Sequence, residues 1–191
     1  MKKLLLGTAL SAALFSTANA NAADYVIDTD GAHAFVTFKI KHLGYSWLHG
    51  RFNTFSGDFS YDDKAPNASK INVTIDTKSI DSNHAERDKH LKGSDFLDVK
   101  KYPTATFKST DFKSTGEGTG EITGDFTLHG VTKSITFPVE RIGEGDDPWG
   151  GYRAGFMGTT KLKLSDYGID YNLGPASTHV EIELHVEGNR Q

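Results

Sequence analysis

Apolar and polar residues alternate with a period of two through most of the chain beyond residue 23. Val36, Phe38 and Ile40 fall on one side of their segment, and Thr37 and Lys39 fall on the other. The same alternation returns in five later segments, 71–76, 122–128, 135–139, 154–164 and 180–186. This period is typical of β-strands that have one face in a core and the other in solvent.

The segments between these runs are short and rich in turn-forming residues, such as 63–67, 114–118 and 145–148. Gaps of this length join antiparallel neighbours, because a parallel pair needs a crossover of a dozen or more residues. We therefore expect an all-β fold, a single antiparallel β-barrel of about eight strands. The expected strands are 24–41, 50–61, 70–76, 103–113, 119–128, 131–142, 152–165 and 178–188.

One segment breaks the alternation and predicts a short helix near 83–92. Asn83 is a residue type that caps the first amides of a helix, and Glu86 stands three positions later, as in a capping box. Gly93 suits a left-handed helix stop. No linker, charge block or internal repeat interrupts the rest of the chain, so we expect one domain.

The first 22 residues have the layout of a secretory signal peptide. Lys2 and Lys3 precede an uncharged apolar run, and small residues follow it, so that cleavage fits after Ala20 or, as we prefer, after Ala22. The apolar run is shorter than the roughly 20 residues of a membrane-spanning helix. We expect export to the periplasm and a mature domain of residues 23–191 that does not span a membrane.

Charge and cysteine content exclude several classes of function. The net charge of −4 becomes −6 once the two lysines of the signal segment are removed, and such an acidic chain is a poor nucleic-acid binder. The chain has no cysteine, which excludes thiol nucleophiles, zinc–thiolate sites and iron–sulfur clusters. No G-x-S-x-G elbow occurs, and we expect no catalytic residues.

The helix segment concentrates ionisable side chains, and two interpretations stay open. Arg87, Asp88 and His90 could form a polar cluster that binds an anionic or quinone-like head group, with the guanidinium as bidentate donor. A solvated surface helix explains the same residues. The pairs His84/Asp88 and Glu86/His90 stand at metal-ligand spacing, but no third ligand accompanies them, so we expect neither a metal nor a cofactor.

Aromatic and aliphatic residues crowd the segment 43–61 and the inner side of the predicted strands. An eight-stranded barrel has an interior that side chains fill or that holds one slim ligand. Periodicity does not distinguish a filled interior from a hollow one.

The ordered set of motifs in this chain resembles the YceI family of secreted bacterial proteins, and the resemblance runs from about Asp24 to Gly188. The motifs that carry it are the stretches 42–47, 50–57, 83–91, 94–98, 102–107, 130–133, 145–151 and 173–177. The family resemblance implies a lipocalin-like barrel with a hydrophobic tunnel, a periplasmic location, no established catalytic residues and a long-chain polyisoprenoid ligand, such as an isoprenoid quinone or a prenyl phosphate.

From this resemblance we expect the lipid tail to lie between apolar strand faces and its head group near Trp47, Arg87 and His90. The residues expected along the tail are Phe38, Ile40, Phe55, Phe59, Ile75, Phe126 and Phe156. Two alternatives remain: an enzyme that acts on such a lipid through Arg87, Asp88 and His90, and a stress-related protein with a filled core. The sequence leaves homodimerisation open.

Overall fold

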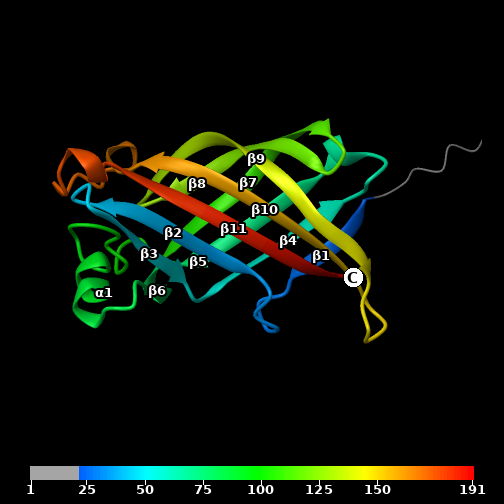
Figure 1. Cartoon of the computed structure of the whole chain (residues 1–191), viewed down its shortest axis with the longest axis horizontal. Helices are drawn as coiled ribbons and strands as arrows, with labels where there is room; N and C mark the ends of the chain where they lie inside the picture. The colour runs from blue at the N-terminus through cyan, green and yellow to red at the C-terminus, as the bar shows by residue number, and fades with distance from the viewer. Residues whose placement is uncertain (1–21) are drawn as a thin grey trace, which may run out of the picture.

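The structure is a computed structural model that describes residues 22–191. Strands dominate it and surround one elongated interior, with a single α-helix at one end (Figure 1). The elements are β1 Ala23–Ile27, β2 Phe35–His42, β3 Ser46–Phe52, β4 Phe55–Tyr61, β5 Lys70–Asp76, β6 Ile80–Asp81, α1 Ala85–Leu91, β7 Thr104–Gly116, β8 Thr119–Leu128, β9 Val131–Asp146, β10 Tyr152–Lys163 and β11 His179–Arg190, together with the 3-10 turns η1 Pro66–Ala68, η2 Thr77–Ser79, η3 Leu164–Tyr167 and η4 Pro175–Ser177. The predicted signal segment 1–22 lies outside the described residues except for its last position.

The strands form a closed antiparallel barrel. Following the hydrogen-bonded neighbours, the sheet runs β1-β4-β5-β7-β8-β9-β10-β11, and β1 pairs again with β11 to close the ring. Strand β2 continues β1 along the same edge of β11, β3 is continuous with β4, and β6 continues β5. Each of these pairs of short strands occupies the place of one barrel strand, and we call each such place a stave. The barrel therefore has eight staves, and the predicted all-β, eight-stranded antiparallel barrel is confirmed.

Three of the eight staves are interrupted, which the sequence did not predict. The loop 28–34 separates β1 from β2, residues 53–54 separate β3 from β4, and η2 separates β5 from β6. The breaks at 53–54 and η2 face each other, because Asn53 N–H donates to the Ser79 carbonyl at 3.1 Å and Asp76 N–H donates to the Thr54 carbonyl at 3.0 Å. The two staves bend together, and pairing resumes beyond the bend.

The inward faces of the staves supply the core, as the alternation predicts. Val36 and Phe38 are buried on β2, and Phe59 and Tyr61 are buried on β4. Close packing is visible where Phe38 lies across from Gly50 of β3, since a Cβ on that glycine would come within 2.3 Å of the Phe38 ring. A larger residue at position 50 would push this ring into the interior.

The predicted helix is present, although its ends differ from the expectation. Asn83 does not cap it: Asn83 adopts a left-handed φ of 62°, and the N-cap is His84, whose Nδ1 accepts from Arg87 N–H at 3.3 Å. The C-cap is Lys92 in a right-handed conformation, so Gly93 is not the left-handed stop that we predicted. A left-handed Asn83 turns the chain sharply out of β6 and sets α1 across the barrel end.

Candidate functional site: an apolar cavity in the barrel

The barrel interior is hollow at the end where α1 lies. A cavity of about 410 Å³ has a lining that is almost entirely apolar and comes from strands around the whole ring. Its volume lies within the range of about 300–1,000 Å³ that small-molecule sites occupy. A second, smaller cavity of about 80 Å³ continues towards the opposite end, and the two share Val73, Phe107, Phe137 and Leu184 in their walls. These four residues lie between the two cavities, which we together call the channel.

An aromatic cluster closes the far end of this channel. Tyr25 and Phe59 stack with ring centroids 4.7 Å apart, and Phe156 meets Phe59 and Tyr61 edge-on at 5.5 and 5.0 Å. Offset and edge-to-face contacts are the preferred geometries for aromatic pairs. A ligand tail that entered from the α1 end would therefore stop against aromatic rings.

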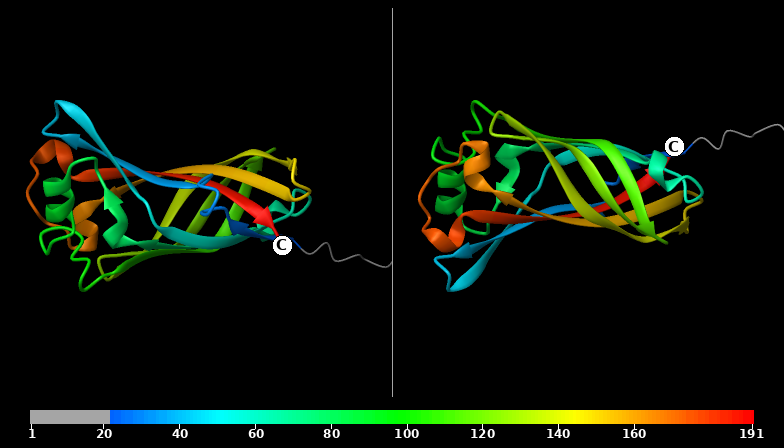
Figure 2. Two further views of the ribbon diagram at one scale, coloured as in Figure 1. Left: turned by 90° about the horizontal axis from the view of Figure 1, so that it is seen from below. Right: turned by 90° about the horizontal axis from the view of Figure 1, so that it is seen from above.

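The cavity opens at the α1 end, because several of its lining residues there are also exposed to solvent. Leu43 at the β2–β3 turn is 57% exposed, Tyr171 in the loop after η3 is 47% exposed, and the His90 side chain on α1 is 47% exposed. We call the opening between these residues the mouth. Both views in Figure 2 show that α1, the 164–178 segment and the β2–β3 hairpin gather at this end of the barrel.

His90 is held in the mouth by aromatic and polar contacts. Its ring meets Phe96 and Tyr171 edge-on, with centroid distances of 4.9 and 5.2 Å. Its Nε2 lies 3.0 Å from Asp95 Oδ2. The aromatic contacts fix the ring between two apolar faces, while the carboxylate orients one ring nitrogen.

Arg87 is positioned by the chain that enters the helix. Its Nε donates to Ser82 Oγ at 2.7 Å, and its Nη2 donates to the Ser82 carbonyl. Asp88 Oδ1 accepts from the same serine through its N–H at 2.8 Å and through its hydroxyl. Ser82 is 3% exposed, so these bonds satisfy its polar atoms away from water. Arg87 is also one of the residues that line the larger cavity.

The structure distributes the predicted ligand-binding residues in three groups. Phe38, Ile40, Ile75, Phe126, Arg87 and His90 all line the larger cavity. Phe59 and Phe156 line the smaller one. The remaining two, Trp47 and Phe55, line neither. Phe55 packs against the core instead.

Trp47 points away from the interior. Its ring lies on the outer face of β3 beneath Lys39 Nζ at 5.2 Å and Lys41 Nζ at 5.6 Å. The residue is 45% exposed. The structure thus places the Trp47 ring outside both cavities.

Several mouth residues were not identified as a site from the sequence. Leu43, Phe96, Tyr171 and Leu173 line the cavity next to His90, and Lys41, His42 and Ser177 add polar groups there. The Ser177 hydroxyl donates to the Lys41 carbonyl and so ties η4 to β2. The stretch 173–177 is conspicuous in the sequence as a Leu-Gly-Pro-Ala-Ser motif, and this motif is the signal that could have indicated the mouth.

The candidate catalytic and metal groups on the helix have structural partners. Asp88 binds Ser82, His84 caps the helix, and Glu86 lies 4.0 Å from Lys89 Nζ. The pairs His84/Asp88 and Glu86/His90 gain no third ligand: within residues 22–191, the three-residue cluster with metal-ligand spacing is Asp28, His33 and Glu187.

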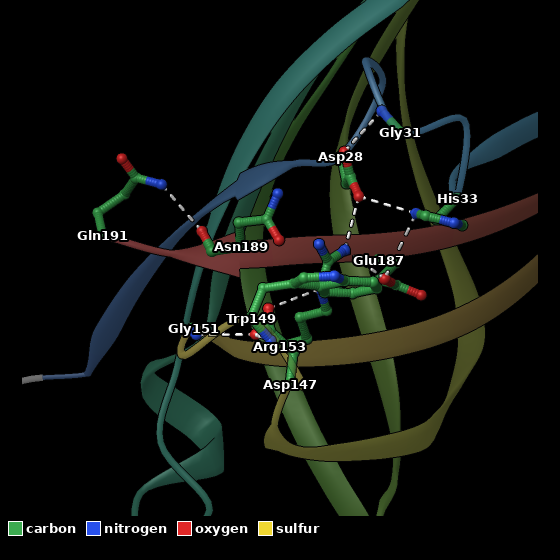
Figure 3. A network of polar contacts seen from close by, with 10 residues as sticks. All are labelled: Asp28, Gly31, His33, Asp147, Trp149, Gly151, Arg153, Glu187, Asn189 and Gln191. Atoms are coloured by element: carbon green, nitrogen blue, oxygen red, sulfur yellow. Dashed lines mark hydrogen bonds and ion pairs between the residues drawn. The ribbon is translucent and has the colours of Figure 1, made fainter.

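That cluster lies at the opposite end of the barrel and is already occupied by Arg153 (Figure 3). Arg153 Nη1 lies 2.6 Å from Asp28 Oδ2 and 2.7 Å from Glu187 Oε1, and its Nε lies 3.0 Å from Asp147 Oδ2. Hydrogen bonds from His33 and Arg153 hold the pKa of Asp28 well below its usual range. A guanidinium among these carboxylates supplies the positive charge that a metal ion would bring.

The described part of the chain contains no helix of the length and apolarity needed to cross a membrane.

Comparison with known proteins gives a consistent family. A model of the YceI-like domain matches residues 25–188. A UPF0312 protein of Pseudomonas aeruginosa is 60% identical over 191 residues, which is 100% of both chains. The crystal structure of the Campylobacter jejuni YCEI protein superposes with a TM-score of 0.71 at 31% identity, over 80% of this chain and 90% of that one.

A fourth similarity concerns the fold alone. The structure of a polyisoprenoid binding domain from Saccharophagus degradans, implicated in plant cell wall breakdown, matches with a TM-score of 0.65. The match covers 89% of this chain and 99% of that chain, with 18% sequence identity.

Proposed function

Because the chain belongs to the YceI-like domain family, and because its barrel holds an apolar cavity whose charged side chains lie at the mouth, we propose that it is a non-catalytic carrier for a long-chain polyisoprenoid lipid. The observation that carries the proposal is the distribution of polarity along the channel. Apolar side chains make up most of the lining of both cavities, and Arg87, His90 and Lys41 stand where a head group would lie. The polyisoprenoid binding domain with the same fold supports this ligand class.

The energetics favour a ligand with a long hydrocarbon tail. Each buried methylene contributes about 0.8 kcal/mol, so ten buried carbons contribute roughly 8 kcal/mol before ordering costs. The polar groups of the mouth then need only to orient the head group, because a phosphate or quinone oxygen buried without a donor loses several kcal/mol. The tail therefore supplies most of the binding free energy, and the residues of the mouth determine which head group is accepted.

A catalytic alternative has less support from the geometry. Asp88 accepts both polar hydrogens of the buried Ser82 and does not line the cavity, so the Arg87/Asp88/His90 cluster does not present an acid–base pair to a ligand. A filled-core protein is disfavoured by the cavity of about 410 Å³. We keep the carrier as the proposal.

The test is a titration of delipidated protein with polyprenols of increasing length, followed by fluorescence or calorimetry. The expected result is an affinity that rises steeply with each added isoprene unit and levels off when the channel is full. Affinity that does not depend on chain length, or turnover of the polyprenol during the titration, would contradict a carrier.

We also propose that the protein acts in the periplasm, on the basis of the basic, apolar and small-residue order of positions 1–22. The intact mass of protein from the periplasmic fraction tests this. The expected mature chain begins at Ala23 or Asn21. A chain that keeps Met1, or one found only in the cytoplasm, contradicts the proposed location.

A further inference from the structure

The β2–β3 hairpin turns at its tip in an unusual way. Tyr45 N–H donates to the His42 carbonyl at 2.9 Å, and the two residues between them both have positive φ, 52° at Leu43 and 86° at Gly44. This is the pattern of a type I′ turn, in which Asn-Gly is strongly preferred. A leucine in the left-handed region is strained relative to asparagine or glycine. The chain thus keeps an apolar residue where local folding favours a polar one.

The tip is exposed as well as apolar. Tyr45 is 88% exposed, Leu43 is 57% exposed and Trp47 is 45% exposed. Both views in Figure 2 show the hairpin (cyan) projecting sideways from the barrel at the end that carries α1, beside the 164–178 segment. An exposed apolar tip that breaks the local turn preference indicates an interaction surface.

The β2–β3 hairpin itself carries basic residues and no acidic residue, in contrast to the chain as a whole. The chain has a net charge of −4, yet residues 31–57 contain Lys39, Lys41 and Arg51 and no aspartate or glutamate. Lys39 also pairs with Glu181 at 3.2 Å. Among the described residues, Lys41 Nζ has no carboxylate oxygen within 4.0 Å, and it lies over the Trp47 ring.

The hairpin is also the rim of the cavity. Leu43 and Lys41 line the cavity that the carrier proposal fills with lipid. We propose that the β2–β3 hairpin docks on the surface of an anionic phospholipid bilayer, with Leu43, Tyr45 and Trp47 in the head-group region. The mouth then opens onto the membrane. The purpose of this docking rests on the proposed carrier function, but vesicle binding itself does not require a ligand in the cavity.

A bilayer fits this surface better than a protein partner does. Tryptophan and tyrosine are enriched at membrane–water interfaces, where the ring is buried and its polar edge stays wet. Lysines beside them gain from the negative surface potential of anionic lipids. One hairpin at the rim of an apolar cavity thus combines exposed aromatic residues with Lys41, and this combination matches a lipid surface.

The experiment is co-sedimentation of the full mature protein with vesicles of phosphatidylcholine and phosphatidylglycerol in equal parts, and with vesicles of phosphatidylcholine alone. We expect binding to the anionic vesicles and much weaker binding to the neutral ones. Replacing both lysines, Lys39→Gln with Lys41→Gln, should weaken binding to the anionic vesicles by roughly fivefold per lysine.

Two further variants separate docking from folding. Leu43→Asn creates an Asn-Gly turn, which should keep or raise the melting temperature while it weakens vesicle binding about tenfold. Tyr45→Ser should weaken vesicle binding and leave polyprenol binding in vesicle-free solution unchanged, because Tyr45 does not line the cavity. Trp149→Ser is the matched control: Trp149 is 78% exposed in the β9–β10 loop, which lies at the end of the barrel opposite α1 (Figure 1), and its loss should not alter vesicle binding.

Three results would overturn the docking proposal. The first is a wild-type protein that does not bind anionic vesicles although it binds polyprenols, an outcome that leaves the carrier function intact. The second is equal loss of vesicle binding in Tyr45→Ser and Trp149→Ser. The third is a concentration-dependent dimer in sedimentation equilibrium that Tyr45→Ser abolishes, which would assign the tip to a second copy of the chain. Vesicle binding without polyprenol binding would instead refute the carrier function alone.

Discussion

Ala105→Leu distinguishes a hollow barrel from a filled one, because the two give opposite signs for the change in stability. Ala105 is 2% exposed on β7, and it faces the larger cavity. The substitution adds about three carbons on the inner side of the sheet. In a cavity, three buried carbons at about 0.8 kcal/mol each stabilise the empty protein by up to ~2.4 kcal/mol. In a filled core, overpacking would destabilise it by about 1–3 kcal/mol.

The same substitution should weaken ligand binding. A leucine at this position takes space from about three ligand carbons, which corresponds to ~2.4 kcal/mol and an affinity loss of roughly 60-fold. Urea denaturation of delipidated protein measures the first effect, and titration with a polyprenol measures the second. Ala154→Leu is a suitable control, since Ala154 is fully buried and lines neither barrel cavity. A destabilised Ala105→Leu with unchanged affinity would refute the hollow-barrel account.

Two further predictions concern the polar groups at the ends of the barrel. Arg87→Ala should weaken a polyprenyl phosphate more than a polyprenol of equal length, as measured by parallel titrations, because only the phosphate loses a charge-assisted hydrogen bond; equal weakening would show that Arg87 only supports the Ser82 turn. Asp28 has a lowered pKa in the folded state, so its stabilisation is present at neutral pH and is lost as the pH falls below about 4. Asp28→Asn should lower the free energy of unfolding by about 2 kcal/mol at pH 7. The variant should also lose less stability than the wild type when the pH falls below about 4, as measured by urea denaturation at a series of pH values. Identical acid dependence in the two proteins would contradict this role.

The alternation in the sequence predicts the barrel and most of the cavity wall, because the period of two depends only on which side of a strand faces the core. Phe38 and Ile40 on β2 follow it, and so does Ile75 on β5. The same rule assigns Trp47 correctly when it is applied within β3. Leu48 and Phe52 line the cavity, and because side chains alternate along a strand, the odd-numbered residues of β3, including Trp47, must face outward. Our expectation for Trp47 came from its neighbourhood in the sequence and not from its strand face.

The mouth was less predictable, because it consists of turns and loops without a period. Tyr171 and Leu173 meet His90 across the barrel end only after the 164–178 segment folds back over it. The breaks in the staves likewise depend on tertiary contacts. The bend at 53–54 exists because the partner stave bends at η2. The pairing of Arg87 with Ser82 depends on the left-handed turn at Asn83, which the sequence suggested only as a helix cap.

The most direct test of the proposed carrier function is the native mass of the protein purified from its cells without detergent, followed by extraction and mass spectrometry of whatever is bound. The account predicts one long-chain isoprenoid lipid per barrel, and its amount should fall sharply in Ala105→Leu but not in Trp149→Ser. A protein that carries no lipid, or one whose only bound lipid is bulk phospholipid that both variants keep equally, would contradict the account.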